Sequence, residues 1–412
     1  MEVIYECCCG LDVHAKTVVA CVVKKGRKEI RTFGTMTEEL LHLGDWLTTE
    51  GCTHVAIEST GVYWKPVFNL LEGVVEVILV NARHIKAVPG RKTDVRDCEW
   101  LADLLRHGLL KASFIPPREI RELRELTRYR QTLLREHTAV ANRIQKLLES
   151  GNIKLGQVAS DVLGQSGRLM LHALAEGEQD ARKLAELAQG KLKSKKDALR
   201  QALVGRLTQV QRWVLGELLA RVEELDSALQ RVETRIGEEV EHCPDPFVQE
   251  AVVLLDSMPG IGEHVARTIV AEIGVDMARF PSAEHLASWA GLCPGNNESA
   301  GKRKSGQTTK GSQYLRTALV EAAWAATRAK GTFLAAKYYR LVKRMGKKKA
   351  LVAVAHGMLR VVYYLLCRRV GYTDLGSEYV TQHHVNQQRQ RLVKKLEALG
   401  VKVTLEEVGQ AA

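Results

Sequence analysis

The sequence predicts a mixed α/β domain over residues 1–117, followed by a chain that is almost entirely helical. Short β-branched runs alternate with amphipathic segments through the first part, which is the pattern of strands and helices that share one sheet. Between residues 118 and 240, glycine becomes sparse and apolar residues recur at helical spacing. We therefore expect an α/β fold class joined to an all-α one.

Five strands and three helices are expected in the first part. The first three strands follow one another closely, and each later strand is preceded by an amphipathic segment of helical period, the first of which ends at Gly51. This order resembles the ribonuclease-H-like layout, which opens with a β-hairpin meander before its βαβ units. The strands are expected within residues 5–13, 17–28, 29–35, 53–60 and 75–83, and the helices within residues 37–51, 63–73 and 94–108.

Residues 118–245 predict a helical coiled-coil domain. One set of apolar residues recurs every seven positions: Leu126, Leu133, Val140 and Leu147. A second set alternates at spacings of four and three: Leu218, Val222, Leu225, Leu229, Val232 and Ile236. Such seams predict two long antiparallel helices, paired within one chain or across a dimer. An ordinary helical bundle is the alternative.

Two prolines in "HCPDPF", residues 242–247, indicate the next domain boundary, because proline interrupts helices. Residues 246–375 are again helical and form the expected C-terminal domain. Residues 376–412 predict a terminal tail, whose "QHHVNQQRQRLVKKLEALG" has the character of an amphipathic helix.

Composition narrows the class of protein. The 412 residues are 45% hydrophobic and 26% charged, which fits a folded chain, and the net charge of +12 favours polyanionic partners, nucleic acid first. Nine cysteines without any CxxC pair argue against zinc and suit a reducing cytosol. No signal peptide opens the chain, and no apolar stretch approaches the ~20 residues that span a bilayer.

Four acids stand where strands end or a helix begins. Asp12 lies in the first strand and points opposite to Leu11 and Val13, because side chains alternate faces along a strand. Glu58 closes a later apolar strand, at the edge where α/β sheets gather ligands. Asp94 and Asp97 stand three apart at the head of a helix, which puts both on one face.

Each acid taken alone has a plainer explanation. Asp12 could pair with Lys16, and acids in a first helical turn complement the helix dipole. The four together indicate a two-metal site, since magnesium requires several hard oxygen ligands. In such a site one ion activates the attacking group and the other stabilises the leaving oxygen.

Three segments of the first domain resemble the N-terminal domain of the DEDD-type insertion-sequence transposases, which has a RuvC-like ribonuclease-H fold. They are "GLDVHAKTVVACVV", "AIESTGVYWKPVFNLLE" and "NARHIKAVPGRKTDVRDCEWLADLLRHGLL". The resemblance implies that Asp12, Glu58, Asp94 and Asp97 are catalytic and hold Mg²⁺, for which Mn²⁺ can substitute. It extends over most of the chain, because the C-terminal half is similar too.

The stretch "MPGIGEHVARTIVAEIG" resembles a helix-hairpin-helix, with Gly260 and Gly262 in a tight turn. Such a turn presents backbone N–H groups at a helix N-terminus, which suits a phosphate of nucleic acid. It tracks the backbone and reads little sequence. A plain helix–helix turn is the alternative.

The loop "GLCPGNNESAGKRKSGQTTKGSQYLR" resembles the C-terminal transposase domain of the same family, whose nucleophilic serine falls on Ser299. A serine hydroxyl is a weak nucleophile and needs help, here from the metal site and local cations. Ala300 departs from the Ser-Gly-Gly of many relatives. The cations expected to bind nucleic acid are Lys302, Arg303, Lys304, Lys310, Arg316, Lys347 and Lys348.

The resemblance implies a DNA transposase or recombinase that exchanges strands through a serine–DNA covalent intermediate. Its implied partners are donor and target DNA, a structured non-coding bridge RNA and further copies of itself, as a homodimer or homotetramer. Its implied place is the prokaryotic cytoplasm, associated with the nucleoid when active. The alternatives are a metal-dependent RuvC-like nuclease or junction resolvase that acts by hydrolysis, and a binding module without activity.

Overall fold

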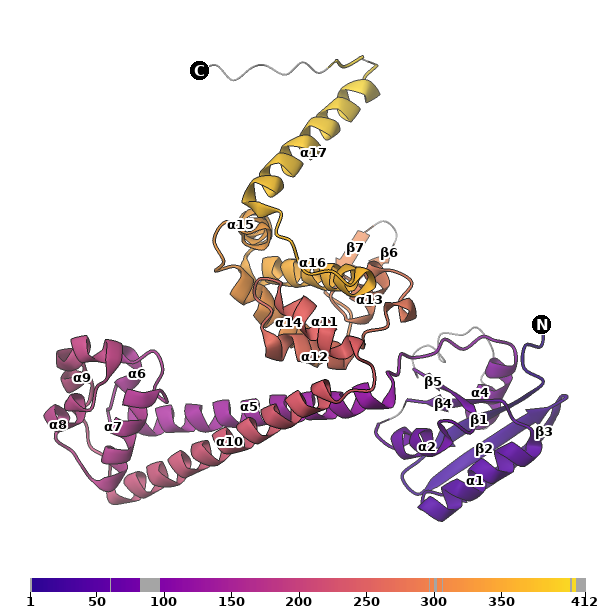
Figure 1. Cartoon of the computed structure of the whole chain (residues 1–412), viewed down its shortest axis with the longest axis horizontal. Coiled ribbons are helices and arrows are strands. Elements are labelled where there is room, and N and C mark those ends of the chain that lie inside the picture. Colours follow the sequence, from indigo (N-terminus) through magenta and orange to yellow (C-terminus); the bar gives the residue numbers. More distant parts are fainter. Residues whose placement is uncertain are drawn as a thin grey trace. The chain divides into compact units, whose positions relative to one another are not determined.

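The computed structural model of the chain describes residues 2–59, 61–81, 97–295, 297–299, 302–305, 307–400 and 402–404. These residues form two compact units, divided between Ile115 and Pro116. The first unit is built on a five-stranded sheet, and the described part of the second is helical apart from one short hairpin (Figure 1). The prediction of a mixed α/β sheet followed by a mostly helical remainder is confirmed.

The sheet of the first unit has the strand order β3-β2-β1-β4-β5. The first three strands form an antiparallel meander, while β4 pairs parallel with β1, and β5 pairs parallel with β4. The central strand is therefore β1, with hydrogen bonds on both edges. The strands are β1 (Cys7–Val13), β2 (Thr17–Lys24), β3 (Arg27–Gly34), β4 (His54–Glu58) and β5 (Glu76–Val80).

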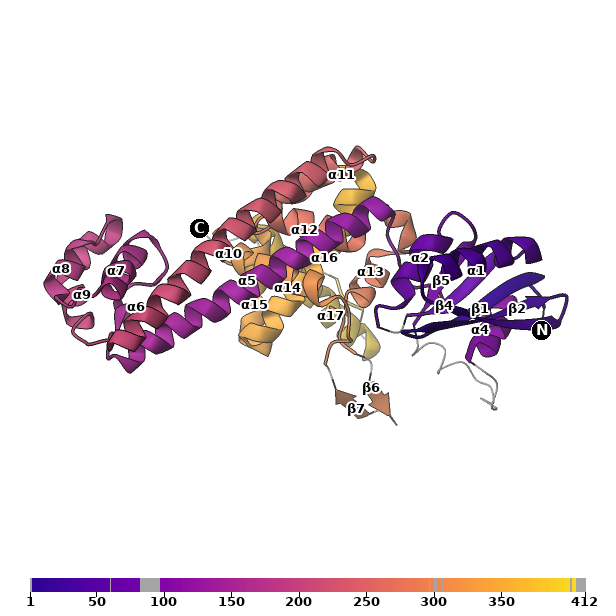
Figure 2. The ribbon, with the colours of Figure 1, turned by 90° about the horizontal axis from the view of Figure 1, so that it is seen from below.

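Helices cover both faces of this sheet. Figure 2 shows α1 (Thr37–Glu50) and α2 (Trp64–Leu71) on one face and α4 (Asp97–Arg106) on the other. The α1 and α2 face contains Leu11 and Ile57 in its core, and the α4 face contains Cys8, Ala56 and Leu101. Even-numbered residues of β1 and β4 therefore face α4.

All nine cysteines are free thiols. Burial raises the pKa of the Cys8, Cys21 and Cys52 thiols to about 12, so these groups stay protonated at neutral pH. They act as small apolar residues of the core and not as reactive groups.

Two long helices open the second unit and pack along each other: α5 (Arg118–Ser150) and α10 (Gln209–Glu241). Arg130 pairs with Glu233, and further along α5 Glu136 pairs with Arg221, so the helices run antiparallel. In the described chain, apolar residues of both helices fill this seam together. A small helical cluster connects their distant ends: α6 (Leu155–Val158), α7 (Gln165–Glu176), α8 (Ala181–Glu186), η1 (Gly190–Lys195) and α9 (Lys196–Ala202).

The rest of the unit is a helical body with the hairpin of β6 and β7 inserted in it. Its elements are α11 (Phe247–Asp256), α12 (Glu263–Ile273), η2 (Met277–Arg279), α13 (Ala283–Trp289), β6 (Asn297–Ser299), β7 (Lys302–Ser305), α14 (Gln313–Ala326), α15 (Phe333–Met345), α16 (Lys347–Arg368) and α17 (Gly376–Ala398). Among the described residues, α16 alone has the length and apolar composition of a membrane-crossing helix. It packs against α11, α13, α14 and α15, as a core helix does.

A buried carboxylate connects three helices of this unit. Glu272, near the end of α12, is 1% exposed, and both of its oxygens accept hydrogen bonds from Arg128 of α5, at 2.7 and 2.9 Å. The hydroxyl of Ser312, which caps α14, donates to the same carboxylate at 2.8 Å. Arg124, one turn earlier on α5, donates to the backbone oxygens of Ala271 and Glu272. Burial lowers the pKa of Arg124 to about 10, and the guanidinium remains charged at neutral pH.

Removing the charge of Glu272 leaves Arg128 without a counter-ion. We expect Glu272→Gln to lower the free energy of unfolding of the helical unit by about 2–3 kcal/mol, measured by urea denaturation. This is below the ~3–5 kcal/mol of a fully buried pair, because the Arg128 side chain is 37% exposed. The matched control is Glu122→Gln, which removes an exposed pair with Arg118 and should change stability by less than about 0.5 kcal/mol. Equal effects of the two substitutions would contradict this account.

Candidate functional site

Asp12 and Glu58 are brought side by side by the parallel register of β1 and β4. Leu11 pairs with Ile57 in that register, so the next positions along both strands are Asp12 and Glu58. Neighbouring strands lie about 4.8 Å apart. Both acids alternate with core residues of the α1 and α2 face, and both therefore stand on the α4 face at the carboxyl ends of their strands.

The helix α4 begins against the same part of β1. A Cβ on Gly10 would lie 2.5 Å from the backbone nitrogen of Ala102 and would overlap the carbonyl oxygen of Cys98, so only glycine permits this approach. Asp97, the first residue of α4, is exposed and precedes Cys98. Burial is the main cause that raises the pKa of Cys98, and the nearby charge of Asp12 adds to it. The start of α4 is thus held beside the two strand acids.

Asp12 has a partner that the sequence did not indicate. Its Oδ2 lies 3.1 Å from Nε2 of His14, and no ion pair with Lys16 is present among the described residues. The Asp12 side chain is 28% exposed, open enough to meet a ligand. The signal that could have identified His14 is its position two residues after Asp12, on the same side of an extended chain.

The fourth predicted acid, Asp94, lies outside the described residues. Within the described ranges, no three histidine, cysteine or carboxylate side chains stand close enough to hold a metal ion. The structure thus brings together Asp12 and Glu58 and places the start of α4 at the same edge. Carboxylate oxygens are the donors that Mg²⁺ prefers, so the chemistry of this edge suits the ion.

Gly260 and Gly262 lie in the turn between α11 and α12, as expected. Gly260 has a φ of +89°, and its Cα lies so close to α14 that a Cβ would be 2.7 Å from the nitrogen of Ala326. Packing alone therefore requires Gly260. Gly262 is the N-cap of α12, and a Cβ there would meet open space. Of the two glycines, Gly262 is the one whose surroundings leave room for a phosphate.

Ser299 is the last residue of β6 and pairs with Lys302 of the antiparallel strand β7. The backbone therefore places the predicted nucleophile at the closed end of a hairpin, with three predicted cations, residues 302–304, on the opposite strand. The side chains of both strands lie outside the described ones. At the base of the hairpin, Gly295 donates to the backbone oxygen of Gln307 at 2.8 Å, and Pro294 bridges to Thr308.

The remaining predicted cations lie on helices and a loop of the same unit. Lys310 is exposed before α14, and Arg316 is half-buried in its first turn. Lys347 and Lys348 are exposed in the first turn of α16, where positive charge opposes the helix dipole. Helix capping therefore does not account for these lysines.

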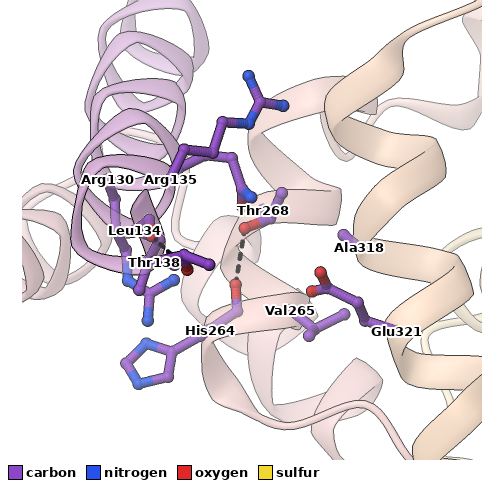
Figure 3. A pocket seen from close by; sticks show the side chains of 10 residues that line it. Arg130, Leu134, Arg135, Thr138, His264, Val265, Thr268, Ala318 and Glu321 are labelled. Atoms are coloured by element: carbon purple, nitrogen blue, oxygen red, sulfur yellow. Dashed lines mark hydrogen bonds between the residues drawn. The ribbon is translucent and has the colours of Figure 1, made fainter. Parts of the chain in front are cut away.

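An open recess of about 410 Å³ lies between α5, α12 and α14, next to the helix-hairpin-helix (Figure 3). Arg130 and Arg135 border it from α5, His264 from α12 and Glu321 from α14. Arg130 is already paired with Glu233, and the mixed charges around the recess select no one class of ligand. None of the predicted site residues lines this recess.

Two family models match the chain. One is a DEDD transposase model of IS110, described as a transposase, and it matches residues 9–153. The other is described as the transposase of the IS116/IS110/IS902 family and matches residues 252–340. The chain belongs to the IS110/IS116 family of insertion-sequence transposases. Membership implies DNA strand transfer, and the first model contains the acidic edge while the second contains the Ser299 hairpin.

Individual relatives agree with this assignment. The transposase is 24% identical over 303 residues to "Transposase for insertion sequence element IS1111A" of Coxiella burnetii, covering 71% of this chain and 72% of the relative. It is 28% identical over 309 residues to an uncharacterized 43.6 kDa protein of insertion element IS110 from Streptomyces coelicolor, covering 70% and 74%. It is also 31% identical over 128 residues to a "Pilin gene-inverting protein" of Moraxella bovis, covering 29% and 38%.

The close approach of α4 to β1 requires that Gly10 has no side chain, and a substitution can test this requirement. We expect Gly10→Ala to lower the stability of the first unit by about 1–3 kcal/mol, because the methyl group overpacks the contact, and to reduce transposition by shifting the start of α4. In the control Gly44→Ala, within α1, the new Cβ meets Leu71 at an ordinary 3.7 Å and should gain about 0.5–1 kcal/mol. Thermal unfolding and a transposition assay measure both, and a tolerated Gly10→Ala disproves the contact.

Proposed function

We propose that this transposase cuts and rejoins DNA through a covalent bond between Ser299 and a DNA phosphate, assisted by a divalent metal at Asp12, Glu58, Asp94 and Asp97. The observation that carries the proposal is the register that sets Asp12 beside Glu58 on the face where α4 begins. Two acids at neighbouring strand ends offer oxygen ligands to one cation, and a bound cation reduces the repulsion between them. The ordinary structural explanations of each acid alone do not require this juxtaposition.

The sheet supports a RuvC-like, ribonuclease-H-like fold for the first unit. Its antiparallel meander, its two further parallel strands and its helices on both faces follow the order of that fold. This topology makes the first and fourth strands neighbours, although their acids are 46 positions apart in the chain. We infer that the contribution of this topology to function is to bring these acids together.

Mg²⁺, or Mn²⁺ in its place, would be held by the carboxylates of Asp12 and Glu58 with those of Asp97 and Asp94. When bound, the ion supplies positive charge that stabilises the phosphate in the transition state. The carboxylates of this chain orient that charge at the strand ends. His14, hydrogen-bonded to Asp12, fixes the direction of one carboxylate.

In the proposed chemistry, each P–O bond that forms replaces a P–O bond that breaks. The Oγ of Ser299 forms a bond to the phosphorus and the P–O3′ bond breaks, which leaves a phosphoserine link and a strand with a free 3′-hydroxyl. The serine proton passes to solvent, and the departing 3′-oxygen takes up a proton. A 3′-hydroxyl of another strand then attacks the phosphoserine and releases the serine. Strands are exchanged without an external energy source.

The partners follow from the same reaction. Exchange requires donor and target DNA and several active sites, so we propose a homodimer or homotetramer. Since α5 and α10 fill their common seam within one chain, association through these helices would use their outer faces. We propose a structured bridge RNA as the guide, whose base pairing reads sequence while the protein reads backbone. The charge of +12 supports binding of such polyanions.

A hydrolytic nuclease is not favoured. Both matched models are those of transposases, and the second contains Ser299, which hydrolysis does not need. The two mechanisms differ in whether protein remains attached to DNA after cleavage.

Covalent capture of DNA tests the proposal. We expect the full-length protein, incubated with Mg²⁺, the proposed bridge RNA of its element and labelled DNA of the element junction, to form an adduct that resists denaturing detergent. Ser299→Ala should abolish the adduct by removing the nucleophile. Asp12→Asn should reduce it at least about 100-fold while DNA binding persists, because the metal site acts in the transition state. The control Ser227→Ala changes an exposed serine of α10, whose hydroxyl donates to the backbone oxygen of Glu223, and should retain the adduct. Cleavage without adduct by Ser299→Ala would falsify the serine mechanism.

We also propose that Ser299 of one subunit meets the acids of another. Mixing Asp12→Ala protein with Ser299→Ala protein should then restore some activity, because a mixed oligomer contains one intact composite site. The mixture is compared with each variant alone at the same total concentration. Absence of recovery, in oligomers shown to exchange subunits, argues for sites completed within one chain.

A further inference from the structure

A group of cations lies between α15 and α16. Lys337 and Arg340 stand three apart on α15, and His356 and Arg360 stand four apart on α16, so each pair shares one helical face. The two helices pack against each other. A Cβ on Gly357 would overlap Nζ of Lys337, so this glycine leaves the space that the ammonium group occupies. Glycine within a helix lowers stability by about 1 kcal/mol relative to alanine. The space that Gly357 leaves for the ammonium group of Lys337 explains why a glycine occurs at this position.

The cluster has more positive charge than the described residues neutralise. Arg360 pairs with Glu284 of α13 at 2.8 Å, and no carboxylate among the described residues forms an ion pair with Lys337. The ammonium group of Lys337 lies over the ring of Phe333, 5.8 Å from the ring centroid. Burial, and then the charges of Arg360 and Arg340, lower the pKa of Lys337. Positive charge of this kind destabilises the free protein until an anion completes it.

The pair between Arg360 and Glu284 does not close the cluster to a ligand. Their side chains are 44% and 58% exposed, and pairs at such exposure contribute little to stability. A guanidinium can therefore leave this carboxylate for a phosphate, which offers two oxygens to its planar fork. Lys337, held on Gly357, contributes a compact charge that needs no rearrangement.

The cluster adjoins the base of the hairpin that carries Ser299. Arg360 pairs with Glu284 at the start of α13, and α13 ends at Trp289, four residues before Cys293. Burial raises the pKa of the Cys293 thiol, and the charge of Glu284 adds to this effect. Cys293 directly precedes Pro294, whose bridge to Thr308 closes the hairpin base. Helix α13, which contributes Glu284, packs on α16 (Figure 1). The cations thus stand on rigid helices beside the flanks of the predicted nucleophile.

We propose that Lys337 and Arg360 bind one phosphate of the DNA strand that Ser299 attacks, a few nucleotides from the cleaved bond. This inference rests on the proposed serine mechanism, because that mechanism brings DNA to the hairpin. The occupant is a DNA phosphodiester, since the substrate of Ser299 is DNA and the two cations flank its hairpin. Lys337 and Arg360 anchor the strand, and Gly357 positions Lys337. The bound phosphate supplies the missing counter-charge.

The test uses the full chain and the variant Lys337→Met, which keeps the length of the side chain and removes its charge. The control is Lys330→Met, an exposed lysine before α15. We expect Lys337→Met to reduce adduct formation at least ten-fold and to leave the midpoint of thermal unfolding unchanged or higher, because an unneutralised charge is removed. Lys330→Met should change neither measurement. A fall in the unfolding midpoint together with normal adduct formation would show a structural lysine and overturn the proposal.

A scan of the DNA identifies the phosphate. Single neutral methylphosphonates replace each phosphate around the cleaved bond in turn. One replacement should reduce adduct formation by the wild-type protein and have no further effect on Lys337→Met, since the contact is already lost. The proposal is overturned if every methylphosphonate reduces adduct formation by the same factor in Lys337→Met as in the wild-type protein. It is also overturned if Lys337→Met affects only binding of the guide RNA.

The two hypotheses fail in different ways. If wild-type protein forms no adduct that depends on Ser299, the serine mechanism fails. If the adduct forms and Lys337→Met matches Lys330→Met, the serine mechanism stands and the phosphate anchor fails. Gly357→Ala gives a second variant, in which the new methyl group displaces the ammonium while its charge remains. It should lose adduct as Lys337→Met does, and normal adduct formation counts against the anchor.

Discussion

The helical unit depends on one buried carboxylate. Glu272 is enclosed where α5, α12 and α14 meet, and each helix satisfies part of it: Arg128 by charge and Ser312 by its hydroxyl. Since a buried charge is tolerated only when it is paired and hydrogen-bonded, the three helices are held in one arrangement. Ser312 begins the helix that follows the hairpin of Ser299, so the same carboxylate fixes where that hairpin is attached. The contacts of Glu272 thus help to position the hairpin that carries the predicted nucleophile.

In the first unit, backbone geometry and not a buried ion pair sets the positions of the predicted site residues. The acids Asp12 and Glu58 are neighbours because β1 and β4 are parallel, and α4 reaches them because Gly10 lacks a side chain. The backbone thereby places both carboxylates at the same edge of the sheet. Preorganisation of this kind is what a metal site requires, since its ligands must be in position before the reaction begins.

Local patterns in the sequence were sufficient for the five strands of the first unit, for the long helices and for the strand-end position of Asp12 and Glu58. The small helices between α5 and α10 and the hairpin of β6 and β7 were not predicted. The alternation around Asp12 and the apolar run before Glu58 depend only on neighbouring residues, so they can be read directly. Glu272 gave no such signal, because an acid in "VAEIG" looks like any exposed helical acid until α5 covers it. Lys337 is equally hidden among surface-like lysines, and the choice of His14 over Lys16 depends on side-chain geometry. Contacts between distant segments are what a single sequence does not contain.

The antiparallel helices α5 and α10 extend far from the contacts of Glu272, so the angle of α5 at these contacts determines where its far end lies. At 1.5 Å per residue, α5 continues for about 30 Å beyond Arg128 before it reaches the small helical cluster, roughly the length of nine base pairs. A tilt of about 5° at the Glu272 joint moves that tip by about 3 Å, close to the rise of one base pair. Any rotation at the Glu272 joint would therefore displace the far end of α5 much more than the residues beside Arg128. The contacts of Glu272, which hold the three helices in one arrangement, limit that displacement.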